Sequence, residues 1–474
     1  MTAELEGGRT PRSPRANRTL LAALGVLLLL RLLAALPIYH DSARAYWLDS
    51  KDYDGLADRM LHGEAYTGVA SDPVELFRTP VYPAFLALIY RLGGKDFGNV
   101  AVAQLVVGGL STLILYVMIR RYAPEGVAFG LCSLYALDPS STFWATNVMS
   151  ETLFTFSVVL VLYVLNRWWE SGRWPWALAA GGLAGAATLV RPIGEVLLPL
   201  WLVFVLLRPV RLSARRWRLV WRPQTGWYAG WVSFAAAAAL VLLPYMFYNY
   251  RVWGTLTIAS VDTYNLGRYH AAPLLVETQG LNLEDALSRL RVSIQPGPDD
   301  RSRYLAIIGE HPLAYAGMFA KGDLVVLFWP EYHRWFGLLD IDFTTRGALG
   351  ALESGKWSDA LRSLAGYVTE EPLTGAALLL TVAYQLVLYA LAVRGFVQGL
   401  HLSPRASSAA LWLGLVATTS LALLLSPGPV GEQRFRVPAQ PGLVLLAACG
   451  WARPLAERAP SEAAATPKGP GSPR

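Results

Sequence analysis

Asp49 is the residue whose type and position best suit acid–base chemistry in this sequence. It comes shortly after an apolar run at residues 19–38, and just before a stretch, 53–61, whose apolar residues repeat at helical spacing. A carboxylate fixed there, close to membrane headgroups, could take a proton from an acceptor hydroxyl. Asp is also a favoured helix N-cap, so the residue by itself leaves a purely capping role open.

Four arginines outside the longest apolar runs are candidates for holding an anionic group. A guanidinium presents a planar fork of N–H donors that suits a phosphate. Ordinary anchoring to lipid headgroups is the alternative for each of them. The four are Arg78, Arg251, Arg434 and Arg436.

Glu151 and Arg191 are a further pair of ionisable residues near apolar runs. Glu151 would lie about one turn inside the run at 148–166, where an ionisable group is expected to face protein or a polar cavity rather than lipid. Two roles stay open for Glu151. It can be a buried partner of Arg191, or it can contact a substrate.

Metal-dependent and nucleotide-dependent chemistry is not expected. Two D-x-D strings, at 52–54 and 340–342, imitate the metal motif of nucleotide-sugar transferases, but no soluble α/β nucleotide domain surrounds them. The histidines lack the spacing of metal ligands, and no glycine-rich phosphate loop is present. We therefore expect no metal site and no cofactor.

The apolar runs define the elements that must position these groups. Of 474 residues, 54% are hydrophobic and 16% are charged, whereas soluble domains carry about 25% charged residues. A helix needs about 20 residues to span a bilayer. We predict an all-α polytopic membrane protein with about ten transmembrane helices. The runs lie at 19–38, 99–119, 126–144, 148–166, 176–191, 193–208, 228–247, 374–394, 408–426 and 437–452.

Arginine placement predicts the topology, because positive charge concentrates in short cytoplasmic loops. With the N-terminus inside, the arginine cluster at 209–226 is cytoplasmic, and two large loops, 39–98 and 248–373, lie outside. Both outer loops should carry interfacial helices, and the Pro-interrupted stretch 77–92 should be interfacial or re-entrant rather than a full crossing. Residues 313–330 are similar and stay open. The net charge of +7 fits this topology and contact with anionic membrane lipids, and we expect no nucleic-acid partner.

The chain then divides into three parts. Residues 1–18 and 454–474 are rich in Pro, Arg, Ala, Ser and Gly, which is typical of disordered segments, and both would be cytoplasmic. Residues 19–453 would form one transmembrane domain.

Short patterns along the chain resemble a known superfamily. After the first apolar run come D-x-x-x-Y, A-x-x-x-L-x-G-x-x-Y and R-x-P-x-Y-P. In this order they resemble the GT-C superfamily of membrane glycosyltransferases, in the branch of protein O-mannosyltransferases and bacterial aminoarabinose transferases. Later stretches similar to that family are DPSSTFWATNVMSETLF, GLAGAATLVRP, LPYMFYNYRVWGTLTIASVDTYNLG and GEQRFRVPAQP.

The resemblance implies a glycosyltransferase that inverts the sugar while moving it from a polyprenyl-phosphate-linked donor. The acceptor would be a hydroxyl or amine of a glycan, lipid or protein at the outer face of the plasma membrane. Asp49 would be the catalytic base, and the four arginines named above would bind the donor phosphate. The residues expected to line the substrate cavity are Tyr53, Tyr82, Glu151, Arg191 and Asn249.

Two other functions fit part of the sequence. A transporter or lipid flippase also has intramembrane charges and large loops, but its expected signature is a pair of inverted halves, and we find no internal repeat. An enzyme of the O-antigen ligase or polymerase kind also has a large outer loop. The Asp-Tyr block ahead of the second apolar run favours the first interpretation.

Overall fold

The computed structural model describes most of the chain. The described residues are 14–47, 49–67, 72–121, 123–206, 209–213, 216–219, 225–329, 331–339, 341, 357–402 and 407–451. Residues 1–13 and 452–474, on which the predicted disordered ends largely fall, lie outside the described residues, as do both aspartates of the 340–342 string.

The N-terminal half consists of helices in the order that the apolar runs predict. The first run forms α2 (Pro14–Leu32), a 3-10 turn η1 (Leu33–Ala35) and α3 (Leu36–His40), which lead through η2 (Ser42–Ala45) into the first large loop. That loop holds α4 (Ser50–Leu61), α5 (Val74–Phe77) and α6 (Val81–Gly93). The following helices are α7 (Phe97–Ile119), α8 (Glu125–Ala136), α9 (Pro139–Thr146), α10 (Glu151–Ser171), α11 (Trp174–Val190) and α12 (Gly194–Leu206).

The C-terminal half begins with a two-stranded antiparallel hairpin, β1 (Pro209–Ser213) and β2 (Arg216–Leu219), in which Val210 pairs with Arg218. The sequence gives no sign of this hairpin. The long α13 (Thr225–Trp253) leads into the second large loop. That loop holds α14 (Val261–Asn265), the π-helical η3 (Leu266–Ala271), α15 (Ala272–Gln279), α16 (Leu283–Leu290), α17 (Asp300–Glu310), α18 (Pro312–Phe328), α19 (Tyr332–Leu338) and α21 (Trp357–Glu370). The last elements are α22 (Pro372–Leu402), α23 (Ser407–Leu425), η5 (Gly428–Val430), η6 (Gln433–Ala439) and α24 (Gln440–Cys449).

Five described helices are long and apolar enough to cross a membrane, at Leu21–His40, Phe97–Ile119, Glu151–Ser171, Tyr228–Trp253 and Pro372–Leu400. Four shorter apolar helices lie at Val81–Gly93, Trp174–Val190, Gly194–Leu206 and Leu411–Leu425. The predicted class of all-α polytopic membrane protein is confirmed.

One predicted run is not a single helix. The run at 126–144 divides into α8 and α9, because Pro139 cannot continue a helix from the residues before it. Asp138 caps the new helix, and its carboxylate accepts a hydrogen bond of 2.7 Å from the backbone N–H of Ser141. This break turns the chain shortly before α10 begins.

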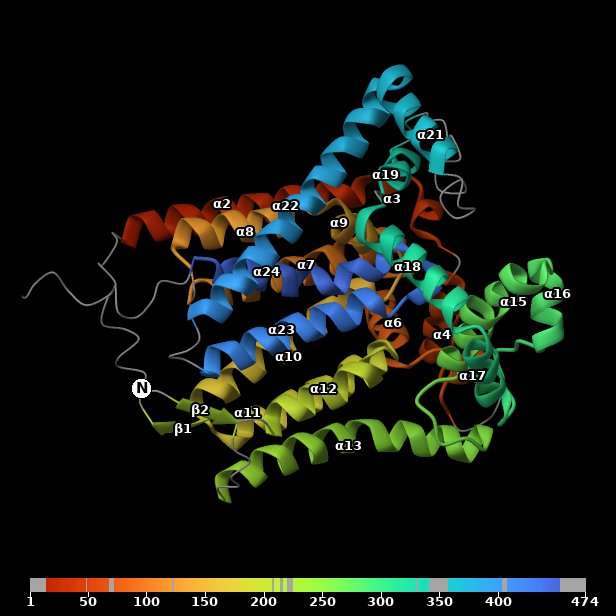
Figure 1. The fold of residues 1–474 in the computed structure, drawn as a ribbon, viewed down its shortest axis with the longest axis horizontal. Coiled ribbons are helices and arrows are strands. Elements are labelled where there is room, and N and C mark those ends of the chain that lie inside the picture. The colour runs from red at the N-terminus through yellow and green to blue at the C-terminus, as the bar shows by residue number, and fades with distance from the viewer. Residues whose placement is uncertain are drawn as a thin grey trace, which may run out of the picture.

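The helices of the bundle run side by side, with helices of both predicted outer loops at one end and the hairpin of the predicted cytoplasmic loop at the other (Figure 1). Helices α4, α6 and α15–α17 gather at the right-hand end of the view, and the β1–β2 hairpin lies at the left-hand end. The contact between α11 and α13 is close: a Cβ on Gly181 would lie 2.1 Å from the carbonyl oxygen of Phe234. Gly181 is therefore a small residue that allows these two helices to approach closely.

The first loop supports the site through its short helices. Pro80 precedes α6 and Pro83 falls in its first turn, where a proline is tolerated. One face of α6 is buried, with Tyr82, Leu86 and Tyr90, while Leu92 on the other face is exposed. With 13 residues, α6 is shorter than a full crossing.

Candidate functional site

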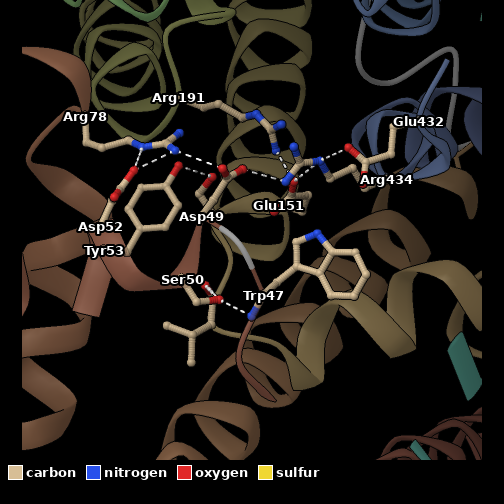
Figure 2. Close-up of polar contacts among 12 residues, drawn as sticks. Trp47, Asp49, Ser50, Asp52, Tyr53, Arg78, Glu151, Arg191, Glu432 and Arg434 are labelled. Carbon is tan, nitrogen blue, oxygen red and sulfur yellow. Dashed lines mark hydrogen bonds and ion pairs between the residues drawn. The ribbon is translucent and has the colours of Figure 1, made fainter. Parts of the chain in front are cut away.

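Asp49 stands immediately before α4, but its side chain does not cap that helix. Its two carboxylate oxygens instead accept hydrogen bonds from two arginines, 2.9 Å from Nη2 of Arg78 and 2.8 Å from Nη1 of Arg434 (Figure 2). These arginines come from positions 29 residues later and 385 residues later in the chain. The capping alternative for Asp49 therefore does not describe what its carboxylate does.

The backbone beside Asp49 is anchored by Ser50, which is fully buried. The Ser50 hydroxyl accepts a hydrogen bond of 2.8 Å from the N–H of Trp47 and donates one of 3.0 Å to the carbonyl oxygen of Val148. This joins the start of α4 to the segment that precedes α10. The position of the Asp49 carboxylate is thereby fixed relative to Glu151, the first residue of α10.

Arg78 contacts two aromatic rings and two carboxylates. Its guanidinium carbon lies 5.0 Å from the ring centre of Tyr53 and 4.6 Å from that of Phe77. Its Nε and Nη2 donate to one oxygen of Asp52 at 3.0 and 2.9 Å, in addition to the bond to Asp49. A planar cation in contact with aromatic rings is restricted in its orientation, which suits it to binding a further anion.

Arg434 connects Asp49 to a second set of charges. Its Nε lies 2.7 Å from a carboxylate oxygen of Glu432 and 3.8 Å from one of Glu151. Glu151 is fully buried and lies 2.6 Å from Nη1 of Arg191. The pairing of Glu151 with Arg191 is thus present, and the same carboxylate also faces the residue that contacts Asp49 (Figure 2).

We call this series of contacts the ion chain. It runs in the order Asp52, Arg78, Asp49, Arg434, Glu432 and Glu151, Arg191. Its members come from the first loop, the start of α10, the end of α11 and the segment around η6, so distant parts of the sequence meet here.

The pKa of Asp49 reflects its two cationic neighbours. Burial alone would raise the pKa of this carboxyl, but the charges of Arg78 and Arg434 and their hydrogen bonds outweigh burial and lower the pKa to about 2. Asp49 is therefore ionised over the whole physiological range. Its side chain is 27% exposed, compared with 12% for Arg78 and 13% for Arg434.

Two tyrosines form the aromatic support below the ion chain. Tyr53 and Tyr82 are both buried, and their rings meet edge to face with centroids 4.8 Å apart. The Tyr53 hydroxyl lies 3.3 Å from that of Ser150, and the Tyr82 hydroxyl donates to Gln104 at 2.9 Å. Tyr53 contacts Arg78 directly, whereas Tyr82 packs against Tyr53 and supports Arg78 only through it.

Three residues predicted for the site are not brought to the ion chain. Arg436 is fully buried, and its fork donates to the Ser140 hydroxyl and to backbone carbonyls, so it does not present its guanidinium at the surface as the sequence suggested. Arg251 is exposed near the end of α13, with its guanidinium carbon 5.9 Å from the ring centre of Phe247. Asn249 is buried and donates to the carbonyl oxygen of Thr257, which orders the chain leaving α13.

Sequence reasoning missed one residue of the ion chain, Glu432, and one beside it, Arg334. Glu432 pairs with Arg434 and also lies 3.4 Å from Arg334. Arg334 stands over the rings of Trp47 and Trp144, at 4.4 and 4.7 Å from their centres. Glu432 lies inside the GEQRFR stretch, so that motif could have indicated it. Nothing in the sequence around Arg334 indicates that Arg334 lies near the ion chain.

The second aspartate of the D-x-D string at 52–54 faces away from Asp49. Asp54 accepts hydrogen bonds from the hydroxyls of Tyr46 and Tyr90 and pairs with Lys95. Among the residues that the structure describes, no group of three or more His, Cys, Asp and Glu side chains is arranged to hold a metal ion. The ion chain places guanidinium N–H donors beside an ionised carboxylate, which are the kinds of groups that anion binding and proton transfer use.

Comparison with known proteins finds one family model that matches part of the chain. The model of the family described as dolichyl-phosphate-mannose-protein mannosyltransferase matches residues 77–243. No curated protein matches the sequence. The matched segment contains Arg78, Glu151 and Arg191 of the ion chain.

Similar solved structures include two membrane enzymes. The Archaeoglobus fulgidus oligosaccharyltransferase AglB, in complex with an inhibitory peptide and a dolichol-phosphate, is 14% identical with a TM-score of 0.48, and the alignment covers 90% of this chain and 50% of that one. ArnT from Cupriavidus metallidurans, bound to undecaprenyl phosphate, is 15% identical with a TM-score of 0.35, over 91% of this chain and 76% of that one. The chain spans about half the length of the oligosaccharyltransferase.

The resemblance to the GT-C superfamily is confirmed by the family match. The described helices are those of a polytopic membrane protein, and residues 77–243 match the mannosyltransferase family model.

Proposed function

We propose that this enzyme transfers a sugar from a polyprenyl-phosphate-linked donor to a hydroxyl or amine of a glycan, lipid or protein. The transfer takes place at the outer face of the plasma membrane, and it inverts the anomeric centre. The observation that carries the proposal is the Asp49 carboxylate held between two arginines at 2.9 and 2.8 Å, because this arrangement combines a base with a binding site for phosphate.

The proposed reaction is a single displacement. The acceptor oxygen or nitrogen forms a bond to the anomeric carbon, and its proton passes to a carboxylate oxygen of Asp49. The bond between the anomeric carbon and the phosphate oxygen breaks, and its electron pair leaves with the polyprenyl phosphate. A phosphate monoester is a stable leaving anion, with a second pKa of about 6. One base and a cationic site therefore suffice, in contrast to glycosidases, which use two carboxylates.

Arg78 and Arg434 are the proposed phosphate ligands. Both have partly exposed side chains, and both touch Asp49, so a phosphate that they hold would bring the anomeric carbon close to the base. Glu432 and Glu151 would orient Arg434, and Arg191 would balance the charge of Glu151. The isolated position of Arg251 and the complete burial of Arg436 give neither a part in this site.

The outer position is supported by charge and arrangement together. Arginines are concentrated at 209–226, as expected for a cytoplasmic loop, and the described strands of that segment lie at the end of the bundle opposite to α4 and α6 (Figure 1). The ion chain includes the residues that begin α4, so it lies at the other end. A lipid-linked donor also suits that side, where nucleotide sugars are absent.

A donor panel tests the proposal. The purified protein, reconstituted in vesicles with membrane lipids and candidate acceptors, would be given radiolabelled sugars on polyprenyl phosphates of different lengths. We expect label to pass to an acceptor from at least one donor, with release of the polyprenyl phosphate. Movement of intact donor across the bilayer without release of polyprenyl phosphate would overturn the proposal and favour a flippase.

A further inference from the structure

The ion chain has no spare cation for a phosphate. Its four carboxylates, Asp49, Asp52, Glu151 and Glu432, face three arginines, and each arginine already lies within 3 Å of at least one carboxylate oxygen. Counting these seven groups alone, the formal charge is −1. An anionic donor approaching this set meets net repulsion unless one carboxylate gives up its place.

Asp49 is the carboxylate that an incoming phosphate can displace most easily. Glu151 is fully buried, and displacing it would leave a buried charge without its partner. Among the described residues, Asp52 contacts only Arg78, through one oxygen that accepts from both Nε and Nη2. Glu432 contacts Arg434 and also pairs with Arg334. Only Asp49, among the described residues, bridges Arg78 and Arg434. A phosphate that takes over the N–H groups now bound to Asp49 on both arginines would occupy the position of the Asp49 carboxylate.

Arg78 and Arg434 each have an N–H group that does not contact a carboxylate and that can bind the phosphate before Asp49 is displaced. The contacts of Arg78 involve Nε and Nη2, and the contacts of Arg434 involve Nε and Nη1. Among the described residues, Nη1 of Arg78 and Nη2 of Arg434 have no hydrogen-bond partner in the protein. A phosphate has several acceptor oxygens and can bind these groups before the carboxylate leaves.

We propose that the donor phosphate exchanges with the Asp49 carboxylate on Arg78 and Arg434, so that donor binding itself releases Asp49 to act as the base. This inference rests on the proposed function. In the free enzyme the two arginines pair with the Asp49 carboxylate, so that it does not accept a proton. In the donor complex they hold the phosphate, and Asp49 is available to an acceptor. The enzyme would bind donor before acceptor.

Two physical observations agree with the exchange. The pKa of Asp49 beside both arginines is about 2, far below the value that makes an effective general base near neutral pH. Neutralising the arginines with phosphate removes the cause of that lowering. Asp49 also makes no capping bond to α4, so its side chain can turn away without breaking the helix start.

Ligand binding to an inactive variant tests the exchange. Asp49→Asn removes the competing charge but keeps the size of the side chain. The affinity of undecaprenyl phosphate would be measured for wild type, for Asp49→Asn and for Glu170→Gln in detergent. Glu170 pairs with Arg121 and Arg167 away from the ion chain and controls for loss of one negative charge. Uncharged undecaprenol serves as the ligand that lacks the phosphate.

We expect Asp49→Asn to bind undecaprenyl phosphate about tenfold more tightly than wild type, on the scale of one hydrogen bond between charged groups. Undecaprenol should bind both proteins equally, and Glu170→Gln should match wild type. Unchanged or weaker binding of undecaprenyl phosphate by a folded Asp49→Asn protein would overturn the exchange.

The outcome is separable from that of the proposed function. Loss of sugar transfer in Asp49→Asn without tighter phosphate binding would leave Asp49 as the base and refute only the exchange. Should Asp49→Asn fold poorly, Asp49→Ser, which also removes the charge, provides the same measurement.

Discussion

Replacing Arg436 by Ala should destabilise the bundle, whereas replacing Arg434 by Ala should leave it folded and suppress sugar transfer. The two arginines are separated by one residue, and both could bind phosphate as judged from side-chain type. Their surroundings differ: Arg436 has no exposed surface, while the Arg434 side chain keeps 13% of its surface exposed.

The cost of losing Arg436 follows from its partners. Its Nη2 donates to the Ser140 hydroxyl at 2.8 Å, and its Nη1 to the carbonyl oxygens of Val326, Leu327 and Trp329 at 3.0, 3.3 and 3.4 Å. Its charge also offsets two buried carboxylates, Asp138 and Glu331. Removing one partner from such a buried arrangement costs about 3–5 kcal/mol.

The cost of losing Arg434 to stability should be much smaller. Its partners Asp49 and Glu432 are 27% and 21% exposed, so water can solvate them, and Glu151 keeps Arg191. Pairs of this kind contribute about 0–1 kcal/mol. Losing a phosphate ligand should instead lower kcat/KM by about ten- to a hundredfold, if one charge-assisted hydrogen bond of about 1.5–3 kcal/mol is lost in the transition state.

Thermal unfolding in detergent and transfer kinetics measure the two effects separately. We expect a clearly lowered Tm for Arg436→Ala and a near-normal Tm with impaired transfer for Arg434→Ala. Arg434→Lys should recover part of the activity, because an ammonium keeps the charge but not the fork. A stable Arg436→Ala protein with a raised donor KM would refute this division of roles.

Three further predictions concern pH, an arginine outside the ion chain, and topology. The constant kcat/KM reports the free enzyme, in which the pKa of Asp49 is about 2, whereas kcat reports the substrate complex, in which the phosphate exchange should raise that pKa. Lowering the pH should therefore reduce kcat before it reduces kcat/KM. If both constants fall over the same acidic pH range, the exchange is contradicted. Arg251→Ala should transfer sugar at the wild-type rate, since Arg251 is exposed and apart from the ion chain. A raised donor KM in this variant would show that Arg251 takes part in donor binding. A cysteine introduced at residue 215 should react with a membrane-impermeant reagent only after the cells are opened. The background should be low because both native cysteines are buried. Labelling of residue 215 in intact cells would contradict the predicted topology.

Much of the fold is predictable because apolar runs and proline positions act locally. Nine of the ten predicted runs correspond to a helix or to a bent helical segment, and the tenth divides at Asp138 and Pro139, where a cap and a helix-breaking residue stand together. The pairing of Asp49 with arginines was open to prediction only through motif order, because its partners lie 29 and 385 residues away.

The different environments of Arg434 and Arg436 depend on a feature that residue types do not reveal. Both fall in the 3-10 helix η6, which has about three residues per turn, so positions two apart point in different directions. One arginine reaches the ion chain and the other the core. Arg334 is harder still, because its partners Trp47, Trp144 and Glu432 come from three distant segments.

The role of Asp49 as the base is tested most directly by comparing sugar transfer in Asp49→Asn and Asp52→Asn vesicles, using the donor that wild type accepts. Both variants remove one carboxylate charge beside Arg78, but only Asp49 also contacts Arg434. We predict that Asp49→Asn remains folded and loses about 10²–10⁴-fold in rate, as expected for a missing general base, while Asp52→Asn keeps most of its activity. Full activity in Asp49→Asn, or loss of activity in Asp52→Asn alone, would contradict the assignment.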